Sequence, residues 1–189
     1  MKFKEALEKS VQLLSSGEFI KRVKEEDETM MKHLPLLQDI NKAGFLTVNS
    51  QGGQKQSGKS ALDGKYYEIS ERAYLVGFLL EEKAVTFLKD LSLKTDKNGI
   101  FVPFCEDTVS IPSNLDIPLT IMKKGGTITV ETHSSVVLPE SVWHSFRKQA
   151  HISKSEKIVF VLCWDTKWNR NASNSSGLFK DVLKILKGI

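Results

Sequence analysis

The sequence predicts an α+β fold in which a single mixed or mostly antiparallel sheet of about five or six strands is flanked by helices. Three observations lead to this prediction. The first 33 residues carry apolar side chains at helical spacing, the middle of the chain alternates between apolar and polar residues, and residues 177–186 form an amphipathic helical pattern. With 189 residues, of which 40% are hydrophobic and 26% charged, the chain has the size and composition of one globular domain.

Residues 1–33 are expected to form a helical segment that packs on an α+β domain spanning residues 34–189. The segment has apolar side chains at spacings of three and four, namely Phe3, Leu7, Val11 and Leu14. A break at residues 15–17 separates this stretch from a second helical stretch. Residues 35–43 then predict a short helix, which Gly44 ends.

The next part of the chain predicts a short strand over residues 45–48, followed by a mobile loop over residues 49–65, which are polar and rich in glycine. A strand is expected over residues 67–80 and a helix over residues 81–93. The remaining strands are expected at residues 100–105, 119–122, 127–137 and 157–164, the last being apolar enough for the centre of the sheet. Helices are expected over residues 139–149 and 177–186.

The strands on either side of residues 123–126 (KKGG) predict a tight hairpin. The second strand alternates, which places Thr127, Thr129, Glu131 and His133 on one face and Ile128, Val130 and Thr132 on the other. Glu131 and His133 could act together as an acid/base pair or as a metal-binding pair. A solvated strand face explains the same pattern and is the interpretation we favour, because one Glu-x-His pair specifies no geometry.

Charge and targeting signals narrow the partners. The net charge of +4 gives weak attraction to polyanions, so neither nucleic acid nor a membrane is indicated as a partner. The N-terminus lacks the apolar region of a signal peptide, which predicts a soluble, intracellular and cytoplasmic protein. Cys105 and Cys163 lie in apolar runs and are expected to be buried free thiols. No metal site is predicted, and the sequence leaves the cofactor unknown.

One segment matches a phosphate-binding pattern. Gly53, Gly58, Lys59 and Ser60 fit G-x-x-x-x-G-K-[ST], in which backbone amides cradle phosphate groups at the start of a helix. This pattern predicts an NTPase or small kinase as one alternative. The polar, glycine-rich composition of the segment makes a chance match common, and Asp63 followed by Gly64 is unfavourable for the long helix that the motif requires.

A second unusual run, residues 164–170, combines two tryptophans with an acid and two bases just after the expected central strand. Ligand sites often lie at that end of a strand, so this run is a candidate binding region. The alternative is structural, with Trp168 anchoring the loop while Asp165 and Arg170 pair with each other. The sequence leaves both interpretations open.

Three segments resemble an uncharacterised domain family found in actinobacteria and large DNA viruses. They are residues 35–51 (PLLQDINKAGFLTVNSQ), 71–78 (ERAYLVGF) and 165–170 (DTKWNR). The family patterns are P-L-x-x-I-N-x-x-G-F-x-T-x-N-S-Q, [QE]-R-A-x-x-x-G-F and D-x-x-W-x-R, in this order. The family often has proline after Asn-Ser-Gln, whereas Gly52 stands here.

The resemblance implies a polar cluster but no chemistry. Its members would be Asn49, Ser50, Gln51, Arg72, Asp165, Trp168 and Arg170. Amide, guanidinium, carboxylate and indole groups suit recognition better than catalysis, because none is an evident nucleophile. Three functions are therefore kept: a module that binds a polar small molecule or nucleotide through this cluster, an NTPase or small kinase, and a structural or assembly protein, for instance a viral one. Whether the protein is an enzyme, and its oligomeric state, stay open at this stage.

Overall fold

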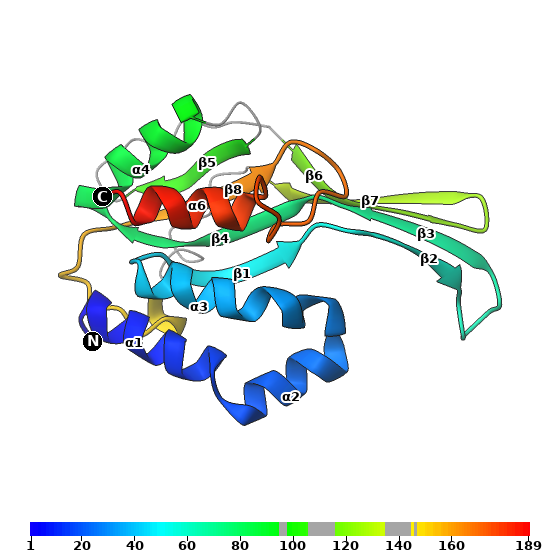
Figure 1. Ribbon diagram of the computed structural model, residues 1–189, viewed down its shortest axis with the longest axis horizontal. Coiled ribbons are helices and arrows are strands. Elements are labelled where there is room, and N and C mark those ends of the chain that lie inside the picture. Colours follow the sequence, from blue (N-terminus) through cyan, green and yellow to red (C-terminus); the bar gives the residue numbers. More distant parts are fainter. Residues whose placement is uncertain (95–97, 106–115, 135–144, 146) are drawn as a thin grey trace.

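The computed structural model describes residues 1–94, 98–105, 116–134, 145 and 147–189, and these form an α+β fold (Figure 1). The helices are α1 (Phe3–Leu14), α2 (Gly17–Glu26), the 3-10 helix η1 (Glu28–His33), α3 (Leu34–Lys42), α4 (Glu81–Lys94) and α6 (Leu178–Leu186). The strands are β1 (Leu46–Gly52), β2 (Lys55–Lys59), β3 (Tyr66–Glu71), β4 (Ala73–Leu80), β5 (Asn98–Cys105), β6 (Asp116–Lys124), β7 (Thr127–Ser134) and β8 (Ile158–Asp165). The predicted helical N-terminus is confirmed. The helix expected over residues 139–149 lies mostly outside the described residues.

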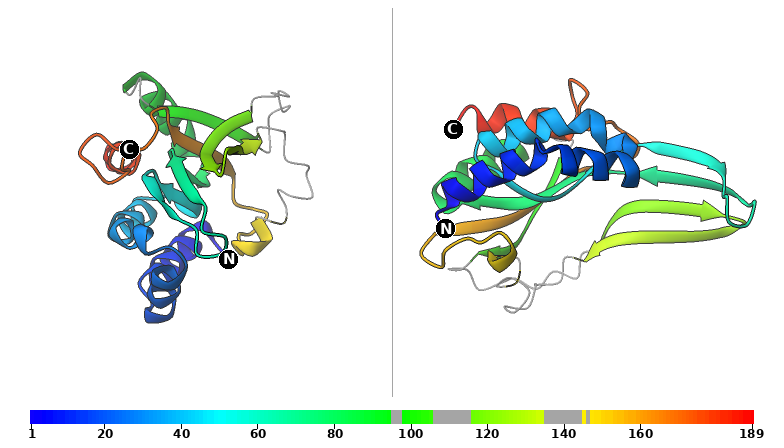
Figure 2. Two further views of the ribbon diagram at one scale, coloured as in Figure 1. Left: turned by 90° about the vertical axis from the view of Figure 1, so that its right-hand side faces the viewer. Right: turned by 90° about the horizontal axis from the view of Figure 1, so that it is seen from below.

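Within the described residues, the strands form two antiparallel sheets instead of the single sheet predicted from the sequence. Sheet A has the order β1-β4-β8-β5 and sheet B the order β2-β3-β6-β7. The apolar strand β8 lies inside sheet A, as predicted. Sheet B projects away from the helices, and we call it the arm (Figures 1 and 2). Among these residues no helix has the length and apolar character that a bilayer crossing requires.

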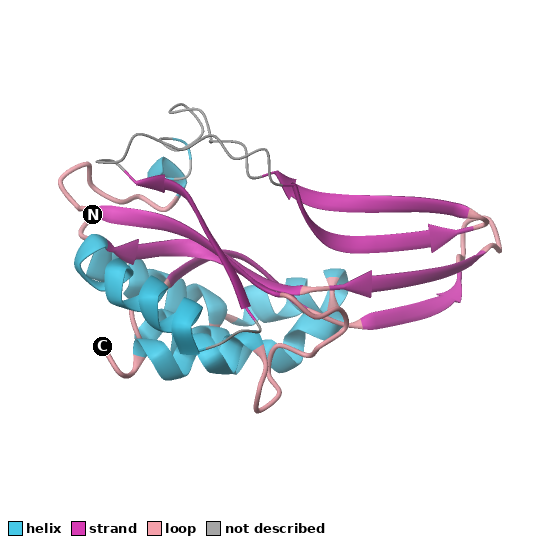
Figure 3. Cartoon of the chain, turned by 90° about the horizontal axis from the view of Figure 1, so that it is seen from above, coloured by secondary structure: helices cyan, strands magenta, loops and turns pink. Residues whose placement is uncertain are grey.

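One long ribbon of two strands belongs to both sheets. β1 leads into β2 and β3 leads into β4, and both pairs, β1 with β4 and β2 with β3, are antiparallel. Only Gly53 and Gln54 interrupt the first strand of the ribbon, and only Arg72 interrupts the second. At this position the neighbouring strand changes, because β3 pairs with β6 whereas β4 pairs with β8 (Figure 3). The ribbon therefore passes from sheet A, in the body of the molecule with the helices, into the arm at Arg72.

Two predictions fail along this ribbon. Residues 49–65, predicted as a loop, complete β1 and form β2 and the turn before β3. Strand ladders are made by main-chain groups, so a polar, glycine-rich composition weakens a strand without excluding it. Residues 67–80, predicted as one strand, belong to two strands in different sheets. Alternation along a sequence carries no information about which strand lies alongside.

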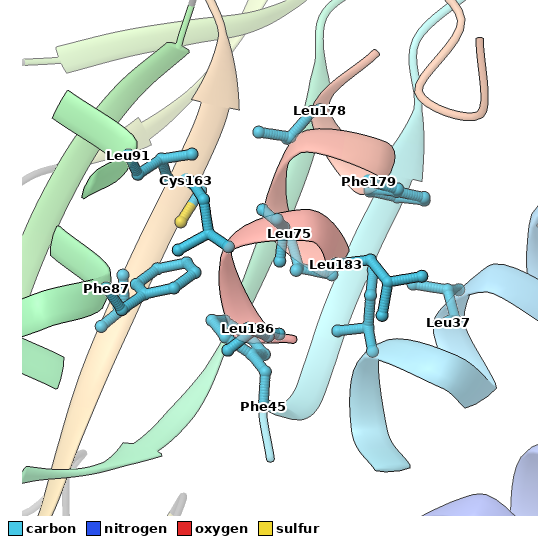
Figure 4. Close-up of a cluster of buried hydrophobic side chains, with 14 of the residues drawn as sticks. Leu37, Phe45, Leu75, Phe87, Leu91, Cys163, Leu178, Phe179, Leu183 and Leu186 are labelled. Atoms are coloured by element: carbon cyan, nitrogen blue, oxygen red, sulfur yellow. The ribbon is translucent and has the colours of Figure 1, made fainter. Parts of the chain in front are cut away.

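The larger apolar core lies between one face of sheet A and the helices α3, α4 and α6 (Figure 4). β8 turns Val159, Val161 and Cys163 to this face, because alternate residues of a strand share a side. The helices contribute side chains at helical spacing, including Leu37, Phe87, Leu91, Phe179 and Leu183. Cys163 is a buried free thiol, as expected, and burial raises its pKa. The side chain of Cys105 lies outside the described part of the chain.

A second core covers the opposite face of sheet A. The rings of Phe78 and Phe160 contact each other there at a tilt of 50°, with centroids 4.9 Å apart. Ile117 and Leu119 at the start of β6 reach over from the arm, and Phe3 comes from the N-terminal helix α1. The backbone N–H of Phe3 donates to Glu156 at 3.0 Å, which fixes the beginning of the chain against the loop before β8. The N-terminal segment therefore contributes to both cores, since Leu14 of the same helix lies in the larger one.

Gly53 lies where the first strand of the ribbon is interrupted, and we call this position the bend. Gly64, in the turn before β3, has the same backbone conformation and serves as a comparison. Both have φ of +67°, which strains any residue with a side chain, but only Gly53 is enclosed. A Cβ on Gly53 would lie 2.6 Å from the carbonyl oxygen of Arg170 and 2.7 Å from the amide nitrogen of Ala73, whereas Gly64 has nothing within 4 Å.

We expect Gly64→Ala to lower the free energy of unfolding by about 1–2 kcal/mol, the cost of a left-handed backbone alone. Gly53→Ala should add an overpacking penalty of roughly 1–3 kcal/mol. Urea denaturation of the two variants measures the difference. Equal losses of unfolding free energy in the two variants would mean that the structure around Gly53 accommodates a Cβ without a steric penalty.

Candidate functional site

Five of the seven polar residues predicted from the sequence meet where the ribbon changes sheets. The Arg72 N–H donates to the carbonyl oxygen of Leu119 at 2.8 Å, which continues the pairing with β6 by one residue. Its own carbonyl oxygen accepts from Nε2 of Gln51 at 3.2 Å, and the same Nε2 lies 3.3 Å from Oγ1 of Thr120. Gln51 of β1 is therefore hydrogen-bonded both to Arg72, between β3 and β4, and to β6. We call the set Gln51, Arg72, Asp165, Trp168 and Arg170 the junction.

The guanidinium group of Arg72 is held by an aromatic ring. Its Cζ lies 4.4 Å from the ring centroid of Trp168, a cation-π contact. Nη1 makes a long hydrogen bond of 3.4 Å to the carbonyl oxygen of Pro118, and the buried Nε has no hydrogen-bond partner among the described residues. Burial lowers the pKa of Arg72, and the negative charge of Asp165 opposes this effect. Arg72 thus remains a cation fixed between β6 and the loop after β8.

Asp165 and Arg170 form a buried ion pair. Asp165 ends β8 and is fully buried, and both of its carboxylate oxygens accept from Arg170, with Nη2 to Oδ1 at 2.6 Å. The backbone N–H of Lys167 also donates to Oδ1, at 2.8 Å. A two-point contact of this kind fixes the guanidinium plane as well as its charge. The structural interpretation of residues 164–170 predicts this pairing.

The loop after β8 is fastened to the ribbon at two further points. The Asn169 N–H donates to the carbonyl oxygen of Glu71 at 2.7 Å, and the Asn169 Oδ1 accepts from the N–H of Glu71 at 3.2 Å. The Ala172 N–H donates to the carbonyl oxygen of Gly52 at 2.8 Å. Main-chain groups left open at the bend are therefore satisfied by this loop, and the bend is held from outside the ribbon.

Asn49 and Ser50 do not belong to the junction. Asn49 is exposed, and its Oδ1 accepts from the N–H of Ser50 at 2.8 Å. Its side chain also hydrogen-bonds Tyr74, where it opposes the effect of burial, which raises the pKa of Tyr74. Both Asn49 and Ser50 line a groove between β1 and the N-terminal helices. The seven-residue cluster inferred from the resemblance is thus split, with five residues at the junction and two at the groove.

The phosphate-binding pattern does not form the structure that it needs. Gly58 and Lys59 lie in β2, opposite Tyr67 and Tyr66 of β3. Ser60 begins the turn to β3, where its N–H donates to the carbonyl oxygen of Lys65 at 2.9 Å. Gly53 lies at the bend of the ribbon. Since a strand and a hairpin turn follow Gly53 in place of a helix N-terminus, these residues cannot aim successive amides at a phosphate group.

Glu71 is a half-buried carboxyl group next to the junction. Burial raises its pKa, nearby Asp27 and Glu131 raise it further, and a hydrogen bond from Gln54 lowers it. Glu131 is exposed on β7, and the side chain of His133, its predicted partner, lies outside the described part. Among the described side chains, no group of three or more His, Cys, Asp or Glu is placed to hold a metal ion.

His33 is a buried polar residue that the sequence did not indicate. It is 1% exposed, its Nδ1 lies 2.6 Å from Oγ of Ser173, and its ring stands edge-on to Phe179. Burial lowers its pKa to about 4, with the charge of Lys32 adding to the effect and Asp27 opposing it. Its partner is 140 positions away in the chain, so no spacing in the sequence could have suggested the contact. At neutral pH it is an uncharged link between η1 and the loop before α6.

No protein-family model matches the chain, and no curated protein resembles it at a significant level. Its function must therefore be inferred from the geometry described above.

Truncating Arg170 should show how much the junction contributes to the stability of the fold. We expect Arg170→Ala to lower the free energy of unfolding by about 3–5 kcal/mol, because it leaves the Asp165 charge buried without its main partner. Lys55→Ala, which removes an ion pair with Glu68 between partly exposed side chains, should cost less than about 1 kcal/mol. Chemical denaturation compares the two, and similar small losses would contradict a structural role.

His33 should make stability fall in mild acid. Its folded pKa of about 4 lies below the ordinary 6.5, so between these pH values the unfolded chain binds a proton that the folded chain does not. From pH 7.5 to pH 5 this should remove roughly 2 kcal/mol of unfolding free energy. Urea titrations of wild type and His33→Gln isolate the effect, since glutamine does not titrate. Parallel pH dependence in the two proteins would refute it.

Proposed function

We propose that the protein binds a polar small molecule of about nucleotide size and holds it in the groove between α2 and β1. The groove has a volume of about 410 Å³. This lies within the ~300–1,000 Å³ typical of small-molecule sites. It is bounded by α1, α2, η1 and α3 on one side and by residues 47–50 of β1 on the other. This enclosure between the N-terminal helices and β1 is the observation that carries the proposal.

The lining combines apolar and polar groups in the way that recognition of a small molecule requires. Phe19, Val23 and Met30 are partly buried on the larger core and offer an apolar surface. Around it stand charges of both signs, Arg22 and Glu26 from α2 and Asp27 after it, with the amide and hydroxyl of Asn49 and Ser50 opposite. A ligand with an apolar ring and a polar or anionic end would satisfy both kinds of surface.

Arg22 is the group best placed to meet a negative charge. Its guanidinium lies 5.2 Å from the ring centroid of Phe19, which orients it over the groove without neutralising it. The helix α2 that carries it contains no buried residue. A helix held by so few buried contacts can adjust to a ligand at little cost in stability. The groove can therefore close on a bound molecule by a small shift of α2.

Two features support binding over catalysis. The charged side chains of the junction already have partners within it, Arg170 with Asp165 and Arg72 with the ring of Trp168. His33, a candidate base, is enclosed and holds Ser173 with one ring nitrogen. Neither arrangement presents an activated nucleophile to a groove.

The groove can be tested with labelled protein and known probes. We expect titration with AMP, ATP, GTP and NAD to shift amide resonances of α2 and of residues 48–50 in two-dimensional NMR spectra. Arg22→Ala should weaken binding of the best probe about tenfold, the loss of one charge-assisted contact. Lys21→Ala is the matched control, because this neighbouring cation pairs with Glu25 and does not line the groove.

The indole resonance of Trp168 monitors the junction in the same spectra. Shifts centred on Trp168 would move the site from the groove to the junction, and the groove proposal would then fail. It would also fail if no member of the panel produced a saturable shift at millimolar concentration.

A further inference from the structure

The two edges of the arm are chemically different. In the described residues, β2 forms one edge and β7 the other. β2 carries Lys55 and Lys59, and lysines on an edge strand oppose pairing with another chain. β7 has no lysine, proline or bulge over residues 127–131, and all five residues are exposed. β7 is thus an accessible edge without the usual protection.

The side chains of β7 favour pairing. Ile128 and Val130 lie on the same side of the strand and are 62% and 47% exposed. Val130 stands opposite Ile121 of β6, so the apolar surface continues across the arm. Thr127, Thr129 and Glu131 point to the other side. β-branched residues of this kind fit a pleated surface, and their exposure leaves apolar area that a partner strand would cover.

We propose that β7 pairs antiparallel with β7 of a second copy of this chain, about a two-fold axis at Thr129. In this register each Ile128 faces Val130 of the second copy, and each Glu131 faces Thr127. The result is one continuous eight-stranded sheet made from two arms, an isologous contact in which both copies use the same surface. The inference concerns the arm and is independent of the groove.

The register follows from the side chains. A two-fold axis at Ile128 would leave Val130 opposite Gly126, and an axis at Val130 would set Ile128 against Thr132. Only the axis at Thr129 matches both apolar residues with each other, and cross-strand pairs of β-branched residues stabilise a sheet. The same axis keeps the two Glu131 carboxylates apart, since like charges directly opposite are unfavourable.

Charge complementarity also favours a second copy as the partner. Thr127 stands beside Lys124 in β6. Glu131 of the second copy, opposite Thr127, would therefore lie in the same row as Lys124, two strand spacings away. Lys124 already pairs with Asp63 at 3.2 Å, so Glu131 of the second copy would be a second and more distant carboxylate for this cation. An interface limited to one strand edge falls below the ~1,200–2,000 Å² buried by stable complexes. The dissociation constant of the dimer should therefore be micromolar or higher.

Cysteine cross-linking tests the pairing and its register. Under mild oxidation of concentrated protein, Thr129→Cys should form an intermolecular disulfide, because the two Cα atoms would be about 4.5–5.5 Å apart across the axis. Thr127 is also exposed, but in Thr127→Cys the two cysteines would lie four residues out of register and should cross-link at least fivefold less. Ser57→Cys on the β2 edge should behave like Thr127→Cys, and wild type oxidised in parallel accounts for native thiols.

Sedimentation of the unmodified protein gives the second measurement. Wild type should shift from monomer to dimer between about 10 μM and 1 mM, and Val130→Lys should stay monomeric over that range with an unchanged melting temperature. A monomeric wild type at 1 mM would overturn the proposal. Cross-linking of Thr127→Cys or Ser57→Cys as efficient as that of Thr129→Cys would overturn it as well.

Discussion

At Arg72 the ribbon exchanges one neighbouring strand for another within a single residue, and the direction of the arm depends on how that residue is held. Its main chain is fixed on both sides, by Leu119 of β6 and by Gln51 of β1. Its side chain is fixed by Trp168. Ile117 and Leu119 of β6 also pack in the second apolar core, on one face of sheet A. The polar contacts at Arg72 and these apolar contacts together fix how sheet B leaves sheet A.

The loop after β8 connects this junction with the rest of the molecule. Asp165 and Arg170 close the loop on itself, Asn169 clips it to β3, and Ala172 clips it to β1. Ser173 then meets His33, which belongs to the N-terminal segment. Buried polar groups are costly when they lack partners and specific when they have them. Here they tie three distant parts of the chain to one place, between two cores that supply most of the stabilisation.

The elements with a strong local pattern could be predicted from the sequence. The N-terminal helices, α4, α6, the KKGG hairpin and the apolar strand β8 all follow from periodicity and turn residues. The arm as a separate sheet could not be predicted, because β2 is polar and because the alternation that runs through Arg72 hides the change of neighbouring strand. Of the predicted site, Gln51, Arg72, Asp165, Trp168 and Arg170 converge, while Asn49 and Ser50 lie at the groove. The contact of His33 with Ser173 is set by tertiary packing alone. The G-x-x-x-x-G-K-[ST] match does not indicate a phosphate site here, because the residues after Gly53 form strand β2 where the motif requires a helix.

The two-stranded ribbon that runs from sheet A into the arm also bears on how such a protein can change over generations. Side chains of a strand alternate with a period of two, so adding two residues to each facing strand of the ribbon would lengthen the arm while every side chain kept its face. A one-residue change would turn every side chain beyond it to the opposite face. Length variation beyond Gly53 and Arg72 should therefore come in even steps, with the body left untouched. The distance between the hairpin turns and the helices can therefore change while sheet A and the helices that cover it stay the same.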